Sequence, residues 1–127
     1  MNAFDPRAVR RAFGRAARTY PQAAALQREV ESRLLEQLAY LDDRVPRRVL
    51  DLGCGPGSAA AALKQKWGRK SDVIAMDLAL PMLRQARATA SPAGWLSNPF
   101  ARRPAQVCAD ACALPLAEAS VDVLFSN

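Results

Sequence analysis

Apolar residues recur with one period in the first third of the chain and with another after residue 46. Over residues 23–41, leucine and valine return every three or four positions, which predicts a helix with one buried stripe. A shorter helix is expected over residues 6–19, and Pro21 interrupts or restarts it. Pro46 helps to end the helical pattern, since a residue before proline is pushed away from helical geometry. The predicted stripe consists of Leu26, Val30, Leu34, Leu38 and Leu41.

Short apolar runs alternate with helical stretches after this break. This alternation predicts an α/β fold with a parallel, doubly wound sheet. A strand-like run stops two residues before the end of the chain, so we expect the sheet to be incomplete and the chain to be the front part of a longer protein. Strands are predicted over residues 49–52, 72–76, 106–109 and 121–125, helices over 58–67 and 78–90, and a long loop over 91–104.

The most informative stretch is a glycine-rich turn after the first predicted strand, Asp51-Leu52-Gly53-Cys54-Gly55-Pro56-Gly57. Gly53 and Gly55 allow a tight turn and let a ligand lie against bare backbone. The helix that follows would offer unpaired N–H groups to a polar or anionic ligand. Glycines alone are weak evidence, because any turn from a strand into a helix can use them.

Two further acids follow later strands. Asp77 lies at the end of the second strand, where its carboxylate can accept hydrogen bonds from a ribose diol or cap the helix expected near Ala79. Asp110 closes the third strand, where it could meet an adenine edge or be an ordinary loop acid. The joint occurrence of the glycine turn and both acids indicates a nucleoside ligand.

The turn departs from the dinucleotide fingerprint G-x-G-x-x-G/A, because its sixth position is Ser58. Asp51, two residues before the first glycine, would oppose a diphosphate but could hold an ammonium group. These departures count against a nicotinamide dinucleotide. They favour a ligand with a positively charged amino-acid end.

Composition narrows the chemistry further. The 127 residues suit about one domain, and the absence of histidine excludes Ser-His, Cys-His and His-metal sites within them. Three cysteines are too few for a zinc site and odd in number for a disulfide framework, so we expect no metal and a reducing, cytoplasmic setting. No apolar run approaches the roughly 18 residues of a membrane span, and no membrane partner is expected.

Positive charge is concentrated at the start of a chain whose net charge is +6. Five arginines in the first twenty residues face only Asp5, a block that suits an acidic partner or a solvated helix face. Nucleic acid is the weaker option, because aromatic side chains do not interleave with the arginines. The five are Arg7, Arg10, Arg11, Arg15 and Arg18.

The glycine turn resembles motif I of the class I S-adenosylmethionine-dependent methyltransferases. Asp77 matches their ribose-binding acid, Asp110-Ala111 matches the position beside the adenine, and residues 120–127 resemble motif IV, which approaches the transferable methyl. The resemblance implies a Rossmann-like fold with S-adenosylmethionine as the cofactor. The cofactor-binding residues that it implies are Asp51, Gly53, Cys54, Gly55, Gly57, Asp77, Leu78, Asp110, Ala111 and Asn127.

Residues 9–20 are similar to the lead-in of the malonyl-acyl-carrier-protein O-methyltransferases of biotin synthesis. This similarity implies that residues 1–46 form a helical lid and residues 47–127 the first part of the cofactor domain, with about four strands. It implies as substrate the free carboxylate of a malonyl thioester on an acidic acyl carrier protein. Phe13, Arg18 and Tyr20 become candidates for substrate contact in the lid, although packing accounts equally well for the two aromatic residues.

An activated methyl donor leaves the protein mainly to position the reactants, so no catalytic residue is identified. A carboxylate acceptor is ionised at neutral pH and needs no general base. Cys54 is expected to fill space rather than to act as a nucleophile. The alternatives are a methyltransferase for another small molecule, a nicotinamide-dinucleotide domain, and a truncated cofactor-binding fragment without activity.

Overall fold

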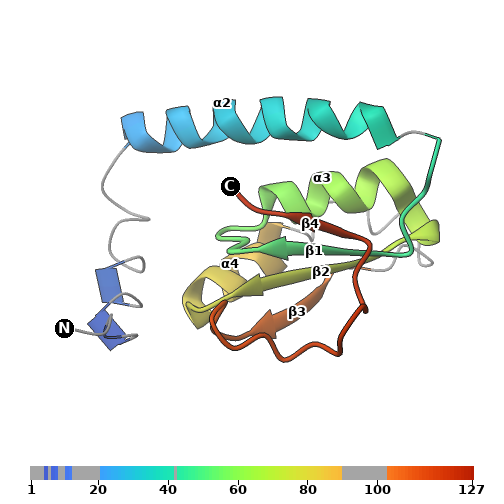
Figure 1. Ribbon diagram of the computed structural model, residues 1–127. Coiled ribbons are helices and arrows are strands. Elements are labelled where there is room, and N and C mark those ends of the chain that lie inside the picture. The colour runs from blue at the N-terminus through green and yellow to red at the C-terminus, as the bar shows by residue number, and fades with distance from the viewer. Residues whose placement is uncertain (1–4, 6, 9–10, 13–20, 42, 90–102) are drawn as a thin grey trace.

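The computed structural model describes residues 5, 7–8, 11–12, 21–41, 43–89 and 103–127. Within these residues, four strands lie side by side in one sheet, α3 and α4 pack against it, and α2 lies along α3 (Figure 1). Most of the helix expected over residues 6–19 lies outside the described residues, as do Phe13, Arg18 and Tyr20. Most of the loop expected over 91–104 does so too.

The sheet is parallel throughout, with strand order β3-β2-β1-β4. The chain moves outward from β1 through β2 to β3 and then returns to β4 on the other side of β1. Open α/β sheets bind ligands beyond the carboxyl ends of their strands, where the strand order reverses in this way. The predicted α/β fold is confirmed, with strands β1 (Arg48–Leu52), β2 (Asp72–Asp77), β3 (Ala105–Cys108) and β4 (Val123–Phe125).

Strand β4 begins two residues later than the predicted 121–125 run. The cause is Asp122, whose carboxylate accepts hydrogen bonds from the backbone N–H groups of Arg47 and Arg48, each at 2.9 Å. The Asp122 N–H in turn donates to the carbonyl of Arg48 at 3.0 Å. These bonds hold the start of β4 against the start of β1. Strand β3, in contrast, begins and ends one residue earlier than predicted.

Helices α3 (Ser58–Trp67) and α4 (Leu80–Thr89) confirm the two predicted crossover helices. Helix α3 ends at Gly68, which has a φ of 58°. Helix α4 starts two residues later than expected, because the Asp77 carboxylate holds the N–H of Ala79 in a turn before it. Both helices contribute to one core cluster with the sheet, whose members include Val49, Ala60, Leu63, Val73, Ala75, Leu83 and Phe125.

The predicted buried stripe of the long N-terminal helix holds for Leu34 and Leu38 but is wrong for its first half and for Leu41. Helix α2 (Pro21–Gln37) continues into the 3-10 helix Leu38–Leu41, and among the described side chains only those of Leu34, Leu35 and Leu38 pack against the core. Leu26 is 67% exposed, because the first half of α2 extends beyond α3 (Figure 1). Val30 and Leu41 are also exposed. None of the described helices is long and apolar enough to cross a membrane.

Candidate functional site

The glycine turn, Asp77 and Asp110 meet at one edge of the sheet, because parallel strands end on the same side. The turn bends sharply from β1 into α3. Gly53, Gly55 and Gly57 have φ values of 71°, 51° and 86°, which side chains with a Cβ rarely adopt. The turn therefore depends on glycine at all three positions.

The three glycines face different surroundings. A Cβ on Gly57 would lie 2.5 Å from the Cβ and 2.9 Å from the Cα of Ala86, so this glycine lets the turn pack against α4. A Cβ on Gly53 or Gly55 would meet nothing within 4 Å. Gly57 thus serves packing, whereas Gly53 and Gly55 leave bare backbone next to open space, as the predicted ligand contact requires.

The backbone N–H groups of the turn are largely bonded within the protein. Those of Gly53 and Cys54 both donate to the carbonyl of Met76, at 2.8 and 2.9 Å, and that of Gly57 donates to Cys54 at 3.0 Å. In the first turn of α3, the Ala60 N–H donates to Asp51. Of the helix N–H groups expected to be free, that of Ala60 is already bonded. The turn is therefore a poor cradle for a diphosphate, which needs such donors.

Asp51 is a buried acid with an unsatisfied oxygen. Its exposure is 2%, and its Oδ2 has no hydrogen-bond partner among the described residues. Burial, together with the nearby charges of Glu31 and Asp77, raises the pKa of Asp51 to about 7. A buried carboxylate oxygen without a partner is unfavourable, so a positively charged group brought to this edge would stabilise the charged form of Asp51.

Both oxygens of Asp77 accept backbone hydrogen bonds. Oδ2 accepts from the N–H of Gly55 at 2.9 Å, and Oδ1 accepts from that of Ala79 at 2.8 Å. The carboxylate thus joins the glycine turn to the start of α4, which supports the capping role. A carboxylate has about four lone-pair sites, so this arrangement also leaves capacity for hydroxyl donors.

The other predicted site residues lie around the same edge. Asp110 holds the turn after β3, where its Oδ1 accepts from the Cys112 N–H at 2.8 Å, and Ala111 is exposed beside it. Leu78 is half-buried, and its carbonyl accepts from the Cys108 thiol at 3.6 Å. Asn127 follows β4, and its side-chain amide donates to the carbonyl of Gln27 on α2 at 3.0 Å.

Glu31 is a site residue that the sequence reasoning missed. Its Oε2 accepts a hydrogen bond from the Ser58 hydroxyl at 3.0 Å, which ties α2 to the first residue of α3. Its negative charge also contributes to the raised pKa of Asp51, after burial and ahead of Asp77. On the sequence it stands among other polar helix residues, so no local signal distinguished it.

Cys54 is 7% exposed and belongs to the core cluster. Burial, with Asp51 and Asp77 nearby, raises the pKa of its thiol to about 12. A thiol with so high a pKa is a poor nucleophile at neutral pH. The expected space-filling role is confirmed.

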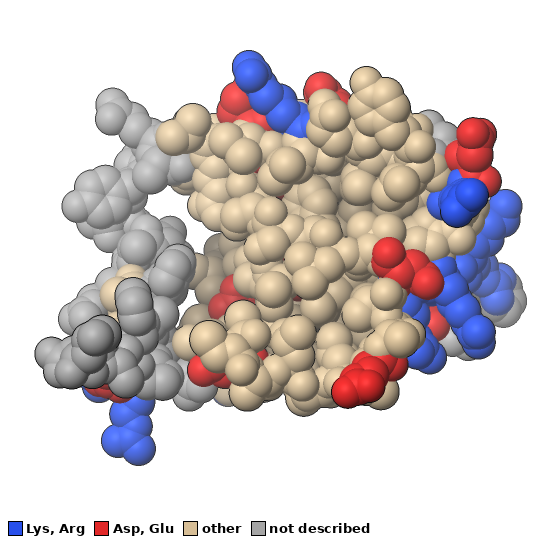
Figure 2. Space-filling view, in the orientation of Figure 1, with Lys and Arg blue, Asp and Glu red and all other residues tan. Residues whose placement is uncertain are grey.

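Charge is distributed unevenly between the two ends of the strands. Lys and Arg gather at the end where the strands begin (Figure 2), and Arg47, Arg48, Arg69 and Lys70 are exposed there. The opposite edge carries Glu31, Asp51, Asp77 and Asp110. The edge with the glycine turn therefore suits a cationic group better than an anionic one.

Comparison with known proteins gives a consistent picture. A family described as "Methyltransferase domain" matches residues 49–127. Malonyl-[acyl-carrier protein] O-methyltransferases from Xylella fastidiosa and a Methylovorus species are 52% and 50% identical over 124 and 123 residues. These alignments cover 98% and 97% of this chain but 39% and 40% of the relatives, so the chain spans about two fifths of their length.

Solved structures share the fold. A magnesium protoporphyrin IX methyltransferase from Synechocystis PCC 6803, crystallised with SAM, superposes with a TM-score of 0.59 at 21% identity, covering 87% of this chain and 57% of that one. A SAM-dependent methyltransferase from Thiobacillus denitrificans, in complex with S-adenosyl-L-homocysteine, superposes with a TM-score of 0.53 at 25% identity, covering 74% of this chain and 35% of that one. The likeness supports a Rossmann-like α/β fold.

Proposed function

The chain belongs to the methyltransferase domain family, and we propose that it binds S-adenosylmethionine at the carboxyl edge of its sheet for methyl transfer. The observation that carries this proposal is the combination of bare glycine backbone at Gly53 and Gly55 with the unpartnered buried oxygen of Asp51. Backbone without side chains lets a flat ligand approach closely, and a buried carboxylate favours a ligand that carries a positive charge. When bound, S-adenosylmethionine supplies a methyl group on a positively charged sulfur.

The site residues have separate roles in this proposal. Asp77, whose carboxylate is fixed by Gly55 and Ala79, accepts hydrogen bonds from the ribose hydroxyls. Asp51 attracts the ammonium end, and the turn at Asp110 borders the adenine. Leu78 and Ala111 line the adenine side, and Asn127 lies toward the methionine end. The chain thus binds and orients its ligand through residues on β1, β2, β3 and β4.

The acceptor that we propose is the free carboxylate of a malonyl group on an acyl carrier protein. Relatives that are 42–52% identical carry that substrate in their names. A malonyl carboxylate is already ionised at neutral pH, so positioning can supply most of the rate without a general base. The absence of histidine from the chain agrees with such a reaction.

We further propose that residues 1–46 form a lid over this edge and that residues 47–127 form the first part of the cofactor domain. The support comes from α2, which meets the edge through Glu31–Ser58 and Gln27–Asn127. Phe13, Arg18 and Tyr20 remain candidates for acceptor contact. The free cysteines at 54, 108 and 112 suit a reducing compartment such as the cytoplasm.

The arginine block at the start of the chain is proposed to attract the acidic carrier protein by electrostatic steering. Arg7 and Arg11 are exposed, although Arg11 lies 3.9 Å from Asp5 in an ion pair. Charge reversal at Arg7, Arg11 and Arg15 should slow association with the carrier protein, and this reduction in rate should become smaller as the salt concentration rises. An association rate that changes neither with the charge reversal nor with the salt concentration would contradict electrostatic steering.

Calorimetric titration with S-adenosylhomocysteine tests the cofactor proposal, with NADH as the control ligand. We expect saturable binding of the first and none of NADH. Asp77→Ala should weaken binding by about tenfold or more through loss of charge-assisted hydrogen bonds, whereas Asp72→Ala, at the far end of the same strand, should leave it unchanged. Binding of NADH instead, or equal affinities for the two variants, would overturn the assignment.

Methylation of malonyl-acyl carrier protein tests the acceptor separately. The assay follows transfer of a labelled methyl group to the carrier protein, with the acetyl form, which lacks the free carboxylate, as the control. Labelling of the malonyl form alone is expected. Equal labelling of the malonyl and acetyl forms would remove this acceptor, whereas binding of S-adenosylhomocysteine with no labelling of either form would favour the alternative of a cofactor-binding fragment without activity.

A further inference from the structure

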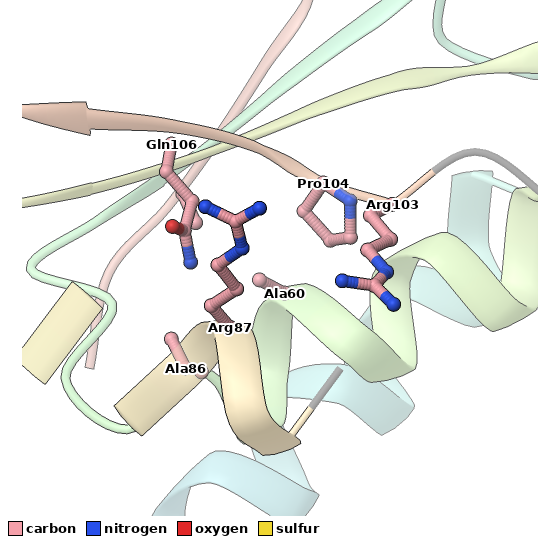
Figure 3. A pocket seen from close by; sticks show the side chains of 8 residues that line it. Ala60, Ala86, Arg87, Arg103, Pro104 and Gln106 are labelled. Atoms are coloured by element: carbon pink, nitrogen blue, oxygen red, sulfur yellow. The ribbon is translucent and has the colours of Figure 1, made fainter. Parts of the chain in front are cut away.

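A cavity lies beside the glycine turn, which contributes Gly57 to its wall. It has a volume of about 290 Å³ and is bounded by α3, α4, β2 and β3 on the helical side of the sheet (Figure 3). Its wall includes four residues with little or no side chain, Gly57, Ala60, Ala75 and Ala86. Packed interiors contain few voids larger than a water molecule, and this volume approaches that of small-ligand pockets. The small residues therefore leave room for an occupant with an apolar body.

The rest of the wall is polar and positively charged. Arg87 extends from α4 toward β3, with its guanidinium beside Gln106, while Arg103 extends from the segment before β3 (Figure 3). The Gln106 side-chain amide donates to the carbonyl of Leu83 at 2.9 Å, which fixes its orientation. None of the eight described residues that line the cavity is acidic.

We propose that this cavity binds a small anionic molecule with a flat apolar body. Its carboxylate or phosphate group would lie at Arg87, since the planar guanidinium matches either group with paired hydrogen bonds, and Arg103 adds positive charge to the same wall. Its body would lie against Ala60, Ala75 and Ala86. The cavity borders the proposed methyl-donor site at Gly57 but is distinct from it, because Gly53, Gly55 and Asp77 do not line it.

An ordinary role for Arg87 is the alternative to be tested. It lies in the last turn of α4, where a cation interacts favourably with the helix C-terminus without any ligand. Arg84 offers a matched control, because it is exposed on the same helix and does not line the cavity. A role in the helix alone predicts no ligand response that depends on Arg87.

The test is an NMR titration of the isotope-labelled full chain with benzoate and with phenyl phosphate, using neutral benzamide as the control. The amide signals of Ala60, Ala75 and Ala86 should shift and saturate with at least one anion, and benzamide should leave them unchanged. A preference between the two anions identifies the carboxylate or the phosphate as the natural group. Arg87→Gln should weaken binding by about tenfold, the loss of one charge-assisted hydrogen bond, and Arg84→Gln should not.

Three results would overturn the proposal. They are no saturable shift with either anion, equal shifts with benzamide, and equal affinities for the two variants. The spectrum of Arg87→Gln without ligand shows whether the variant is folded, and Arg87→Lys, which keeps the charge, should recover part of the binding. Binding of S-adenosylhomocysteine, measured in parallel, is expected to be unchanged by Arg87→Gln.

Discussion

The contact between Gly57 and α4 predicts a large loss of stability from a single methyl group. In Gly57→Ala the new Cβ would lie 2.5 Å from the Ala86 Cβ, at a backbone φ of 86°. A left-handed backbone costs a residue with a Cβ about 1–2 kcal/mol, and overpacking typically costs about 1–3 kcal/mol more. We therefore expect the free energy of unfolding to fall by about 2–5 kcal/mol, a large share of the roughly 5–15 kcal/mol of a typical domain.

Gly55→Ala is the matched control, because its φ is 51° but its Cβ would meet nothing within 4 Å. Urea unfolding should show a loss of only about 1–2 kcal/mol for this variant, the conformational cost alone. A double-mutant cycle with Ala86→Gly, which removes the closest contacting atom, tests this contact further. The double variant should be more stable than the sum of the two single losses predicts, by more than about 0.5 kcal/mol, the usual limit of additivity. Equal losses for Gly57→Ala and Gly55→Ala would refute the packing argument.

Three further predictions concern charge and reactivity. Asp51 has a folded-state pKa of about 7 against an ordinary 3.8, so the folded chain keeps a proton that the unfolded chain loses. The free energy of unfolding should therefore fall as pH rises from about 4 to about 7, by at most about 1.4 kcal/mol per pH unit. Urea unfolding of Asp51→Asn should show a smaller fall over this range, and an unchanged slope would contradict the raised pKa of Asp51. Asp122→Ala removes the acceptor of two backbone N–H groups and should lower the free energy of unfolding by about 1–3 kcal/mol. The control Asp72→Ala, at an exposed position, should lower it by less than about 0.5 kcal/mol. Iodoacetamide at pH 8 should label the exposed Cys108 well before the buried Cys54, and mass spectrometry showing equal rates would count against the raised thiol pKa.

The strands and crossover helices were predictable because their signals are local. The glycine turn that opens α3 and the glycine that follows Trp67 are local signals of this kind, and the structure places α3 over the predicted residues. The approach of the turn to Asp77 was also predictable, since parallel neighbours end at one edge of a sheet.

The remaining features depend on contacts between segments distant in the sequence. The exposure of Leu26 follows from how far α2 extends beyond α3, which no periodicity can express. The N–H groups of Gly53 and Cys54 are bonded because the Met76 carbonyl at the end of the neighbouring strand accepts both of them. Glu31 reaches the site only because α2 lies along α3, so its role has no signature in the residues around it.

The central claim is that the glycine turn at the carboxyl edge binds the methyl donor. The most direct measurement compares calorimetric titrations of S-adenosylhomocysteine into Gly53→Arg and Gly68→Arg. Both glycines have positive φ and open space at the Cβ position, but Gly68 lies at the far end of α3. The account predicts that Gly53→Arg abolishes binding while Gly68→Arg binds like the unaltered chain. Retained binding in a folded Gly53→Arg variant would contradict it.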